Sequence, residues 1–159
     1  MRSSGEVDRA IDLYADTVRR LCMIYLKSYA DTEDIFQNVF IKYLLSSAKF
    51  ESPEHEKAWI IRVTVNECKD LLKSFFRKRS VPLDEIQELR ADAPESSGEV
   101  LDAVMSLPQK YKDAVYLHYY EGYSAAEIAK LLRKNVNTIY TNLARARELL
   151  RERLGDDFE

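Results

Sequence analysis

The sequence contains little of what most enzymes and metalloproteins need. It has four glycines, two cysteines and two histidines among 159 residues. The glycines do not form a phosphate-binding loop, and neither His55 nor His118 stands with cysteines or carboxylates at metal-ligand spacing. No arrangement of serine, histidine and aspartate suggests nucleophilic catalysis. We therefore expect no catalytic residue, no metal and no cofactor, and we expect that the protein is not an enzyme.

The two cysteines, Cys22 and Cys68, both lie in apolar helical patterns. This placement favours buried free thiols in a reducing compartment over the alternative of a disulfide or a metal pair. The sequence shows no signal peptide, and no apolar run approaches the length that spans a membrane. These absences together predict a cytoplasmic protein without direct membrane insertion.

Charge is unevenly distributed along the chain. The net charge of −3 does not by itself indicate a nucleic-acid-binding protein. Residues 80–99 hold six carboxylates and one arginine, whereas residues 124–154 hold seven cations and three carboxylates. We therefore predict two domains, residues 1–79 and 99–159, joined by a flexible acidic linker over residues 80–98. An apolar content of 46% allows both domains to bury a core.

Apolar residues recur at helical spacing throughout residues 1–79. The pattern predicts helices over 8–26, 32–46 and 56–79, with Asp31 or Thr32 as the N-cap of the second. The loop after the second helix is polar except for Phe50, and Pro53 stands near the start of the third helix. Two interpretations of Phe50 remain open. Its ring packs back onto the core, or it is an exposed stacking platform for an unpaired base.

Residues 99–159 show a different arrangement, which ends in a helix-turn-helix. The pattern predicts a short helix from about residue 99 and another over 109–120, closed by Gly122. Ser124 and Glu127 then form a capping box, and Asn135 is the expected N-cap of the last helix. The predicted fold class is therefore all-α, with two small helical domains joined by the linker. The second is a four-helix domain with a helix-turn-helix.

The last helix has a polar outer face. Its buried residues are expected to be Ile139, Leu143, Ala146, Leu149 and Leu150. The residues expected to point outwards are Asn137, Thr138, Tyr140, Thr141, Asn142 and Arg145. Short polar side chains near a helix N-terminus, with cations beside them, suit a helix that lies in the major groove of DNA. The alternative is an ordinary helical hairpin whose outer face is polar because it is solvated.

Three stretches together indicate a family. They are DTEDIFQNVFIKYL from residue 31, KAWIIRVTVNECKDLL from residue 57, and LPQKYKDAVYLHYYEGYSAAEIAKLL from residue 107, followed by NTIYTNLARARELL from residue 137. In this order they resemble the extracytoplasmic-function (ECF) sigma factors of bacterial RNA polymerase. In that family the first stretch binds the core polymerase, the second melts and recognises the −10 promoter element, and the third recognises the −35 element.

The resemblance implies roles for individual residues of the first domain. The core polymerase-binding face would comprise Asp34, Gln37, Asn38 and Leu44, although the family commonly has an acidic residue where Asn38 stands. The residues that would bind the −10 DNA are Phe50, Asn66, Arg77, Lys78 and Arg79. Phe50 and Asn66 fall where the family holds a flipped-out base. The three cations would lie against the phosphate backbone.

In the second domain the resemblance implies contacts with the −35 element. The residues concerned are Asn137, Thr138, Tyr140, Thr141, Arg145 and Arg147, with Arg147 contacting a phosphate or the domain core. Tyr140 and Asn142 depart from the family pattern, which usually has Arg or Lys at these positions. Arg133 stands where the turn often has glycine, and two outcomes are open: the turn is strained by about 1 kcal/mol, or it tolerates the arginine.

The implied partners are core RNA polymerase, promoter DNA and an anti-sigma factor, which in this family is commonly tied to the membrane. The implied function is a sigma factor that binds core polymerase and directs promoter-specific initiation of transcription. The alternative is a stand-alone dimeric helix-turn-helix transcriptional regulator, with the first domain for dimerisation. Such regulators bind palindromic sites as dimers, so a monomer with little affinity for duplex DNA favours the sigma factor.

Overall fold

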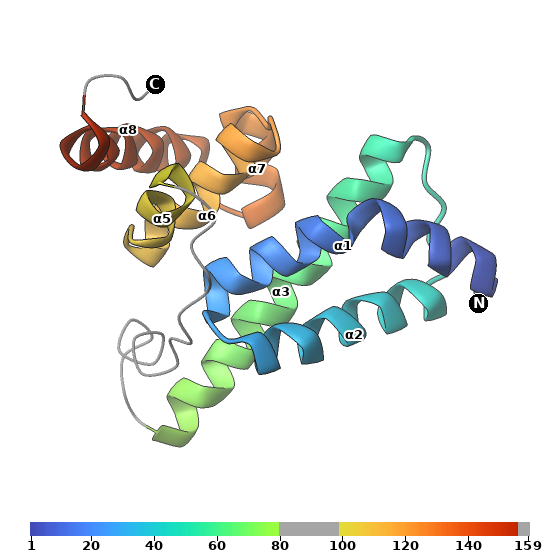
Figure 1. The fold of residues 1–159 in the computed structure, drawn as a ribbon. Coiled ribbons are helices and arrows are strands. Elements are labelled where there is room, and N and C mark those ends of the chain that lie inside the picture. Colours follow the sequence, from blue (N-terminus) through green and yellow to red (C-terminus); the bar gives the residue numbers. More distant parts are fainter. Residues whose placement is uncertain (80–98, 156–159) are drawn as a thin grey trace. The chain divides into compact units, whose positions relative to one another are not determined.

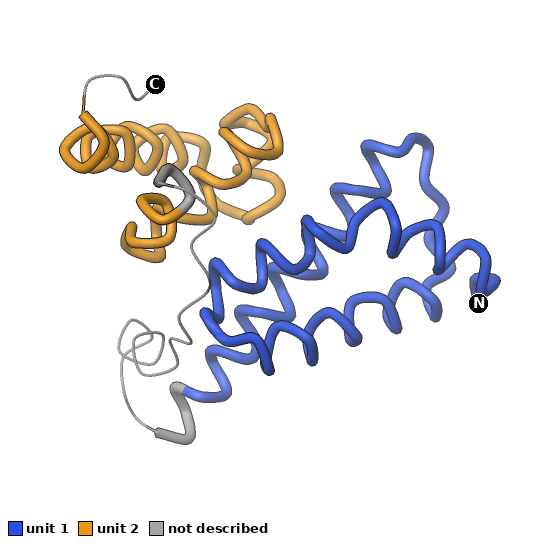
Figure 2. The backbone as a smooth tube through the Cα atoms, in the orientation of Figure 1, with its two compact units in different colours: residues 1–93 blue, residues 94–159 orange. Residues whose placement is uncertain are grey.

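The computed structural model describes residues 1–79 and 99–155, of which 76–79 and 99–101 are described by their backbone only. Every regular element in these ranges is a helix. The chain divides into two compact units, residues 1–93 and residues 94–159 (Figures 1 and 2). The all-α prediction with two helical domains is therefore confirmed. The predicted linker, 80–98, lies outside the described residues.

The first unit is built from three long helices: α1 (Ser4–Leu26), α2 (Tyr29–Leu45) and α3 (Pro53–Arg79). Each packs against the other two. Its core contains Val18, Leu21, Cys22, Ile24, Leu26, Val39, Ile60, Ile61, Val65 and Cys68. The two cysteines are free thiols with their sulfur atoms 3.9 Å apart, as the sequence predicted for buried thiols.

The junction between α1 and α2 differs from the sequence prediction. The first helix ends at Leu26, and Lys27 adopts a left-handed conformation (φ 52°) with its N–H donating to the carbonyl of Met23. The N-cap of α2 is Ser28, whose Oγ accepts from the N–H of Asp31 at 3.3 Å. The prediction of Asp31 or Thr32 as the cap was wrong, because Ser28 starts the helix one turn earlier and Thr32 is buried inside it.

The third helix begins earlier than residue 56. Pro53 is its first residue, a position that proline favours because no intrahelical N–H is required there. The hydroxyl of Ser52 accepts from the N–H of His55 at 3.1 Å and helps to start the helix. The β-branched run in the middle of α3 stays helical, and the hydroxyl of Thr64 donates to the carbonyl of Ile60 at 2.8 Å.

The second unit contains α5 (Glu99–Met105), α6 (Gln109–Val115), the π-helix η1 (Tyr116–Tyr120), α7 (Ala125–Leu132) and α8 (Val136–Leu154). Helix α8 packs against α5, α6 and α7 (Figure 1). The fully buried residues at their centre include Ala114, Val115, Tyr116, Leu117, Ile128, Ile139 and Ala146. The predicted helix over 109–120 is thus continuous but changes from α to π after Val115, a transition that periodicity does not reveal.

Helices α7 and α8 form the predicted helix-turn-helix. The capping box is present: the N–H of Glu127 donates to Ser124 Oγ at 3.2 Å, and the N–H of Ser124 donates to Glu127 Oε1 at 2.9 Å. Asn135 is the N-cap of α8, with its Oδ1 accepting from the N–H of Asn137 at 2.8 Å. The turn between them passes through Arg133, which adopts a left-handed conformation (φ 55°).

Two absences hold for the part of the chain that the structure describes. No helix there is long and apolar enough to cross a membrane. No group of three or more His, Cys, Asp or Glu side chains there could hold a metal ion.

Candidate functional site

The outer side of α2 presents one continuous exposed stripe. Asp34, Gln37 and Asn38 are exposed, and Ile41 and Leu45 continue the same face one and two turns further along. Ile41 is 51% and Leu45 64% exposed, so the stripe carries two large apolar side chains next to its polar ones. We call these five residues the α2 face.

Leu44, which the resemblance implied as a polymerase-binding residue, is less exposed than its neighbour Leu45. Leu44 is half-buried, and its carbonyl accepts from the backbone N–H of Arg2 at 2.9 Å. Leu45 was not among the candidate residues. The signal that could have found it is its spacing, because it follows Ile41 by four positions and Asn38 by seven on one side of a helix.

Ion pairs on two flanks of α2 hold it against its neighbours. Arg19 of α1 pairs with Glu33 (Nε to Oε2, 3.3 Å), and its guanidinium lies 4.1 Å from the ring centroid of Phe36. Lys42 Nζ lies 2.8 Å from Glu67 Oε2 of α3. Exposed pairs of this kind stabilise a fold by less than about 1 kcal/mol each.

The loop after α2 carries Phe50 back onto an aromatic cluster. The ring of Phe50 is parallel to that of Tyr43, with centroids 6.3 Å apart, and meets Trp59 edge-on at 5.8 Å and His55 at 5.4 Å. Phe50 nevertheless stays half-exposed. Both interpretations of this residue are therefore compatible with its position: the ring packs on the unit, and part of it remains accessible for stacking.

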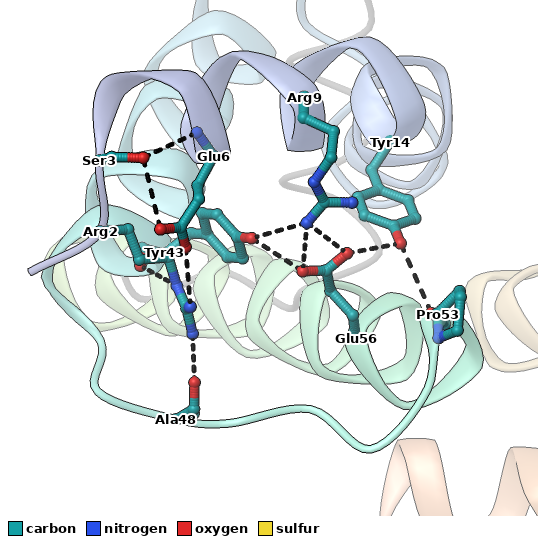
Figure 3. Close-up of polar contacts among 9 residues, drawn as sticks. All are labelled: Arg2, Ser3, Glu6, Arg9, Tyr14, Tyr43, Ala48, Pro53 and Glu56. Atoms are coloured by element: carbon teal, nitrogen blue, oxygen red, sulfur yellow. Dashed lines mark hydrogen bonds and ion pairs between the residues drawn. The ribbon is translucent and has the colours of Figure 1, made fainter.

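A buried carboxylate joins all three helices of the first unit (Figure 3). Glu56 is 6% exposed. Its oxygens accept from Arg9 Nη2 at 2.8 and 3.1 Å, from the hydroxyl of Tyr14 at 2.9 Å and from the hydroxyl of Tyr43 at 2.8 Å. Arg9 and Tyr14 belong to α1, Tyr43 to α2 and Glu56 to α3. Sequence reasoning missed this network, because a single glutamate in the first turn of a helix is usually exposed.

The hydrogen bonds of this network keep the carboxylate of Glu56 ionised although it is buried. Burial alone would raise the pKa of Glu56, but the hydrogen bonds from Arg9, Tyr43 and Tyr14 outweigh it and lower that pKa below its usual value. Burial and the adjacent carboxylate raise the pKa of Tyr14 to about 12. Glu56 is therefore charged and both tyrosines are neutral donors at neutral pH.

One side of α3 carries Asn66 among cations. Arg62, Asn66, Lys69 and Lys73 follow one another at spacings of three and four residues, which places them along a single face. Asn66 and Lys73 are exposed, and Arg62 and Lys69 are half-buried. Asn66 lies about two turns beyond Trp59, the residue against which Phe50 packs. We call this set the α3 stripe.

The predicted phosphate contacts Arg77, Lys78 and Arg79 form the last turn of α3. Their side chains lie outside what the structure describes. The three cations of the α3 stripe, Arg62, Lys69 and Lys73, were not among the candidate residues. Their regular spacing around Asn66 is the signal that could have added them.

The outer face of α8 is as the sequence predicted, with two exceptions. Its exposed residues are Asn137, Thr138, Tyr140, Thr141 and Arg145, with Tyr140 60% exposed. Asn142 was expected to point outwards but is 9% exposed, and its Nδ2 donates to the carbonyl of Lys110 in α6 at 3.1 Å. It follows Ile139 by three positions and so lies on the buried side. Leu149, expected in the core, is 38% exposed.

Arg147 is partly engaged inside the second unit. It is half-buried, and its Nε donates to the hydroxyl of Tyr119 in η1 at 3.2 Å. Tyr119 also meets the ring of His118 edge-on at 4.8 Å. The π-helix thus supplies the hydroxyl that orients Arg147.

Comparisons with known proteins agree with this geometry. The family model described as Sigma-70 region 2 matches residues 10–80, and the one described as Sigma-70, region 4 matches residues 97–150. The RNA polymerase sigma factor SigV of Bacillus subtilis is 32% identical over 138 residues, which cover 85% of this chain and 82% of SigV. The chain belongs to the ECF sigma factors. It directs promoter-specific transcription as the sigma factor of RNA polymerase.

Other similarities are consistent with the same family. The ECF RNA polymerase sigma factor SigW of Bacillus subtilis is 27% identical over 165 residues, which cover 92% of this sigma factor and 87% of SigW. Among solved structures, the sigma factor RpoE of Bartonella quintana, crystallised with the anti-sigma factor NepR, matches with a TM-score of 0.73. That match has 21% identity and covers 96% of this chain and 99% of the other. At this identity it shows a shared fold.

Proposed function

We propose that the two units divide promoter recognition between them. Residues 1–79 bind core polymerase and capture the −10 element, residues 99–159 bind the −35 element, and residues 80–98 connect them. The observation that best supports this division is that each unit has its own core and its own exposed polar face. Nucleic-acid or protein partners can therefore dock on each unit without disturbing its packing.

The proposed polymerase-binding site is the α2 face. Ile41 and Leu45 supply apolar area that a partner can bury, while Asp34, Gln37 and Asn38 supply hydrogen-bonding groups around it. An apolar centre with a polar rim is typical of protein interfaces. Leu44 acts beside this face by anchoring the end of α2, since it is half-buried.

The proposed −10 site lies on the adjacent side of the same unit. Phe50 would stack on an unpaired base, and Asn66 would hydrogen-bond to a base edge in the melted strand. Arg62, Lys69 and Lys73 would neutralise phosphates along α3, a path that Arg77, Lys78 and Arg79 would extend to the end of the helix.

The proposed −35 site is the exposed face of α8. Asn137, Thr138 and Thr141 stand in its first two turns, where a recognition helix contacts base edges. Arg145 would contact a base or a phosphate further along the groove. Asn142 is turned inward onto α6 and is not available to DNA. Tyr140 and Arg145 are the large exposed side chains on either side of it.

The proposal also covers a protein partner and the location of the protein in the cell. The solved neighbour was crystallised with an anti-sigma factor. We propose that an anti-sigma factor also binds this protein and covers the α2 face, because that face carries two exposed large apolar side chains, Ile41 and Leu45. We further propose that the protein is cytoplasmic and has no catalytic activity by itself.

This proposal can be tested with a promoter library. The full chain and purified bacterial core polymerase would transcribe duplex DNA that is randomised upstream of the start site, and the transcribed templates would be sequenced. We expect two separated blocks of base preference. Arg145→Ala should weaken preferences in the upstream block only, and Phe50→Ala should flatten a position in the downstream block only.

A matched control is Arg151→Ala, which removes an exposed arginine from the last turns of the same helix. It should leave both blocks unchanged. The absence of any base preference with the wild-type protein would contradict the proposed function. Loss of both blocks in either single variant would contradict the division between the two units.

A further inference from the structure

Arg2, in the segment before α1, closes the C-terminal end of α2. The last carbonyl groups of a helix have no intrahelical partners. The backbone N–H of Arg2 donates to the carbonyl of Leu44 at 2.9 Å, and its Nε donates to the carbonyl of Tyr43 at 3.0 Å. Arg2 therefore fixes the point at which the chain leaves α2 and enters the loop of residues 46–52.

The same guanidinium also holds the loop itself. It donates to the carbonyl of Ala48 (Figure 3). Its central carbon lies 4.4 Å from the ring centroid of Tyr43 and 5.0 Å from that of Phe50. Cation–π contacts at these distances fix the position of a ring as well as stabilising it. Arg2 thus contacts both the backbone and the aromatic ring of the loop.

Little of Arg2 is left to contact DNA directly. Its Nε and one Nη are bonded to backbone carbonyls, its other Nη lies 3.6 Å from the carboxylate of Glu6, and its side chain is 14% exposed. An effect of Arg2 on nucleic acid must therefore pass through the loop that it holds.

We propose that Arg2 is a positioning residue for base selection: it fixes loop 46–52 so that Phe50 presents its accessible face to an unpaired base of the −10 element. The inference rests on the proposed function of Phe50. Lysine cannot replace Arg2, because an ammonium group cannot bond two carbonyls in a planar fork while stacking on two rings.

The promoter library described above tests this inference. In holoenzyme made with the Arg2→Ala or the Arg2→Lys variant, the position flattened by Phe50→Ala should lose its preference by about fivefold or more. Preferences in the upstream block should stay as in the wild type. The double variant Arg2→Ala/Phe50→Ala should lose no more than Phe50→Ala alone, because both changes act on one interaction.

Arg19→Ala is the matched control. Arg19 also pairs with a glutamate and stacks on a ring, that of Phe36, but has no contact with the loop among those described. It should leave the base preference intact. Titration of each variant against core polymerase shows whether the first unit is still folded.

Three results would overturn the inference. One is an unchanged −10 preference in both Arg2 variants. Another is a uniform loss of transcription across all templates, which would indicate a structural role only. The third is full base selection by the Arg2→Lys variant. If Phe50→Ala itself leaves the −10 block intact, the proposed role of Phe50 fails, and the inference falls with it; a wild-type holoenzyme without any preference would instead refute the proposed function as a whole.

Discussion

A single buried carboxylate organises the first unit at the scale of residues. Glu56 receives hydrogen bonds from one arginine and two tyrosines that come from two other helices. Replacing Glu56 by glutamine keeps one acceptor oxygen, but it puts an NH2 donor where the other oxygen accepts and removes the counter-charge of Arg9. A buried polar group that loses its partner costs more than the net value of the bond itself. Glu56 therefore links α1, α2 and α3 through hydrogen bonds.

The Glu56→Gln variant should lower the free energy of unfolding of the first unit by about 2–3 kcal/mol at pH 7. Because the folded-state pKa of Glu56 is lowered, the contribution of its charge is present above the unfolded-state pKa and is lost as the pH falls through the folded-state value. The difference between the variant and the wild type should thus shrink below about pH 4.5.

The measurement is urea unfolding followed by the fluorescence of Trp59, the single tryptophan of the chain, which lies in this unit. Glu54→Gln is the control, since Glu54 is an exposed glutamate in the same first turn of α3. A difference that stays constant from pH 7 to pH 3 would show that the charge of Glu56 does not stabilise the fold.

Helical spacing predicted the exposure of many residues, but not that of Leu149, which was expected in the core and is 38% exposed. Cys22 and Cys68 are buried and Thr138 and Arg145 are exposed, as expected. Asn142 was misplaced because its polar side chain suggested solvent, whereas its partner is a backbone carbonyl of another helix. The Glu56 network was missed because its members are far apart in sequence, and only the tertiary fold brings them together.

At the scale of elements, the turn between α7 and α8 holds a residue with a side chain in a left-handed conformation. Arg133 ends α7 with φ 55° and ψ 49°, and the N–H of Lys134 donates to the carbonyl of Ala129 at 3.0 Å. A left-handed conformation costs a residue with a Cβ about 1–2 kcal/mol, and glycine escapes this cost but loses more backbone entropy on folding.

The Arg133→Gly variant should therefore range from unchanged to about 1 kcal/mol more stable than the wild type in the second unit. Arg133→Val should be less stable by about 1–2 kcal/mol, because a β-branched side chain tolerates this conformation poorly. Hydrogen exchange of the amides of α7 and α8 in the full chain measures both effects. A glycine variant that exchanges faster than the valine variant would contradict the presence of strain at this turn.

The elements themselves were largely predictable, and their ends less so. Both caps of the helix-turn-helix, Ser124 and Asn135, act as their sequence context indicated. The N-cap of α2 at Ser28 and the π-helix after Val115 were not anticipated. At α2, the hydroxyl of Ser28 caps the helix before the expected residues can do so. After Val115, the backbone adopts the π-helical hydrogen-bond register instead of the α-helical one. The hydrophobic pattern does not distinguish these alternatives from the expected structure.

At the scale of the whole molecule, this ECF sigma factor comprises two compact helical units, each with its own exposed face. The family resemblance assigned the order of functions along the chain, and the matches to Sigma-70 regions 2 and 4 follow that order. The structure adds which side chains are available. On α2 it places Ile41 and Leu45, rather than Leu44, at the surface where a large partner can bury them.

The central claim is that this chain binds core RNA polymerase through the α2 face. The most direct test is titration of the labelled full chain with purified core polymerase, comparing the wild type with the Ile41→Ala/Leu45→Ala variant. The control is Leu13→Ala, which removes a leucine of 58% exposure from α1 in the same unit. We predict tight binding by the wild type and the control, and binding about 30-fold or more weaker for the double variant. Equal affinity of the double variant and the wild type would contradict the role of the α2 face, and no binding by the wild type would contradict the account as a whole.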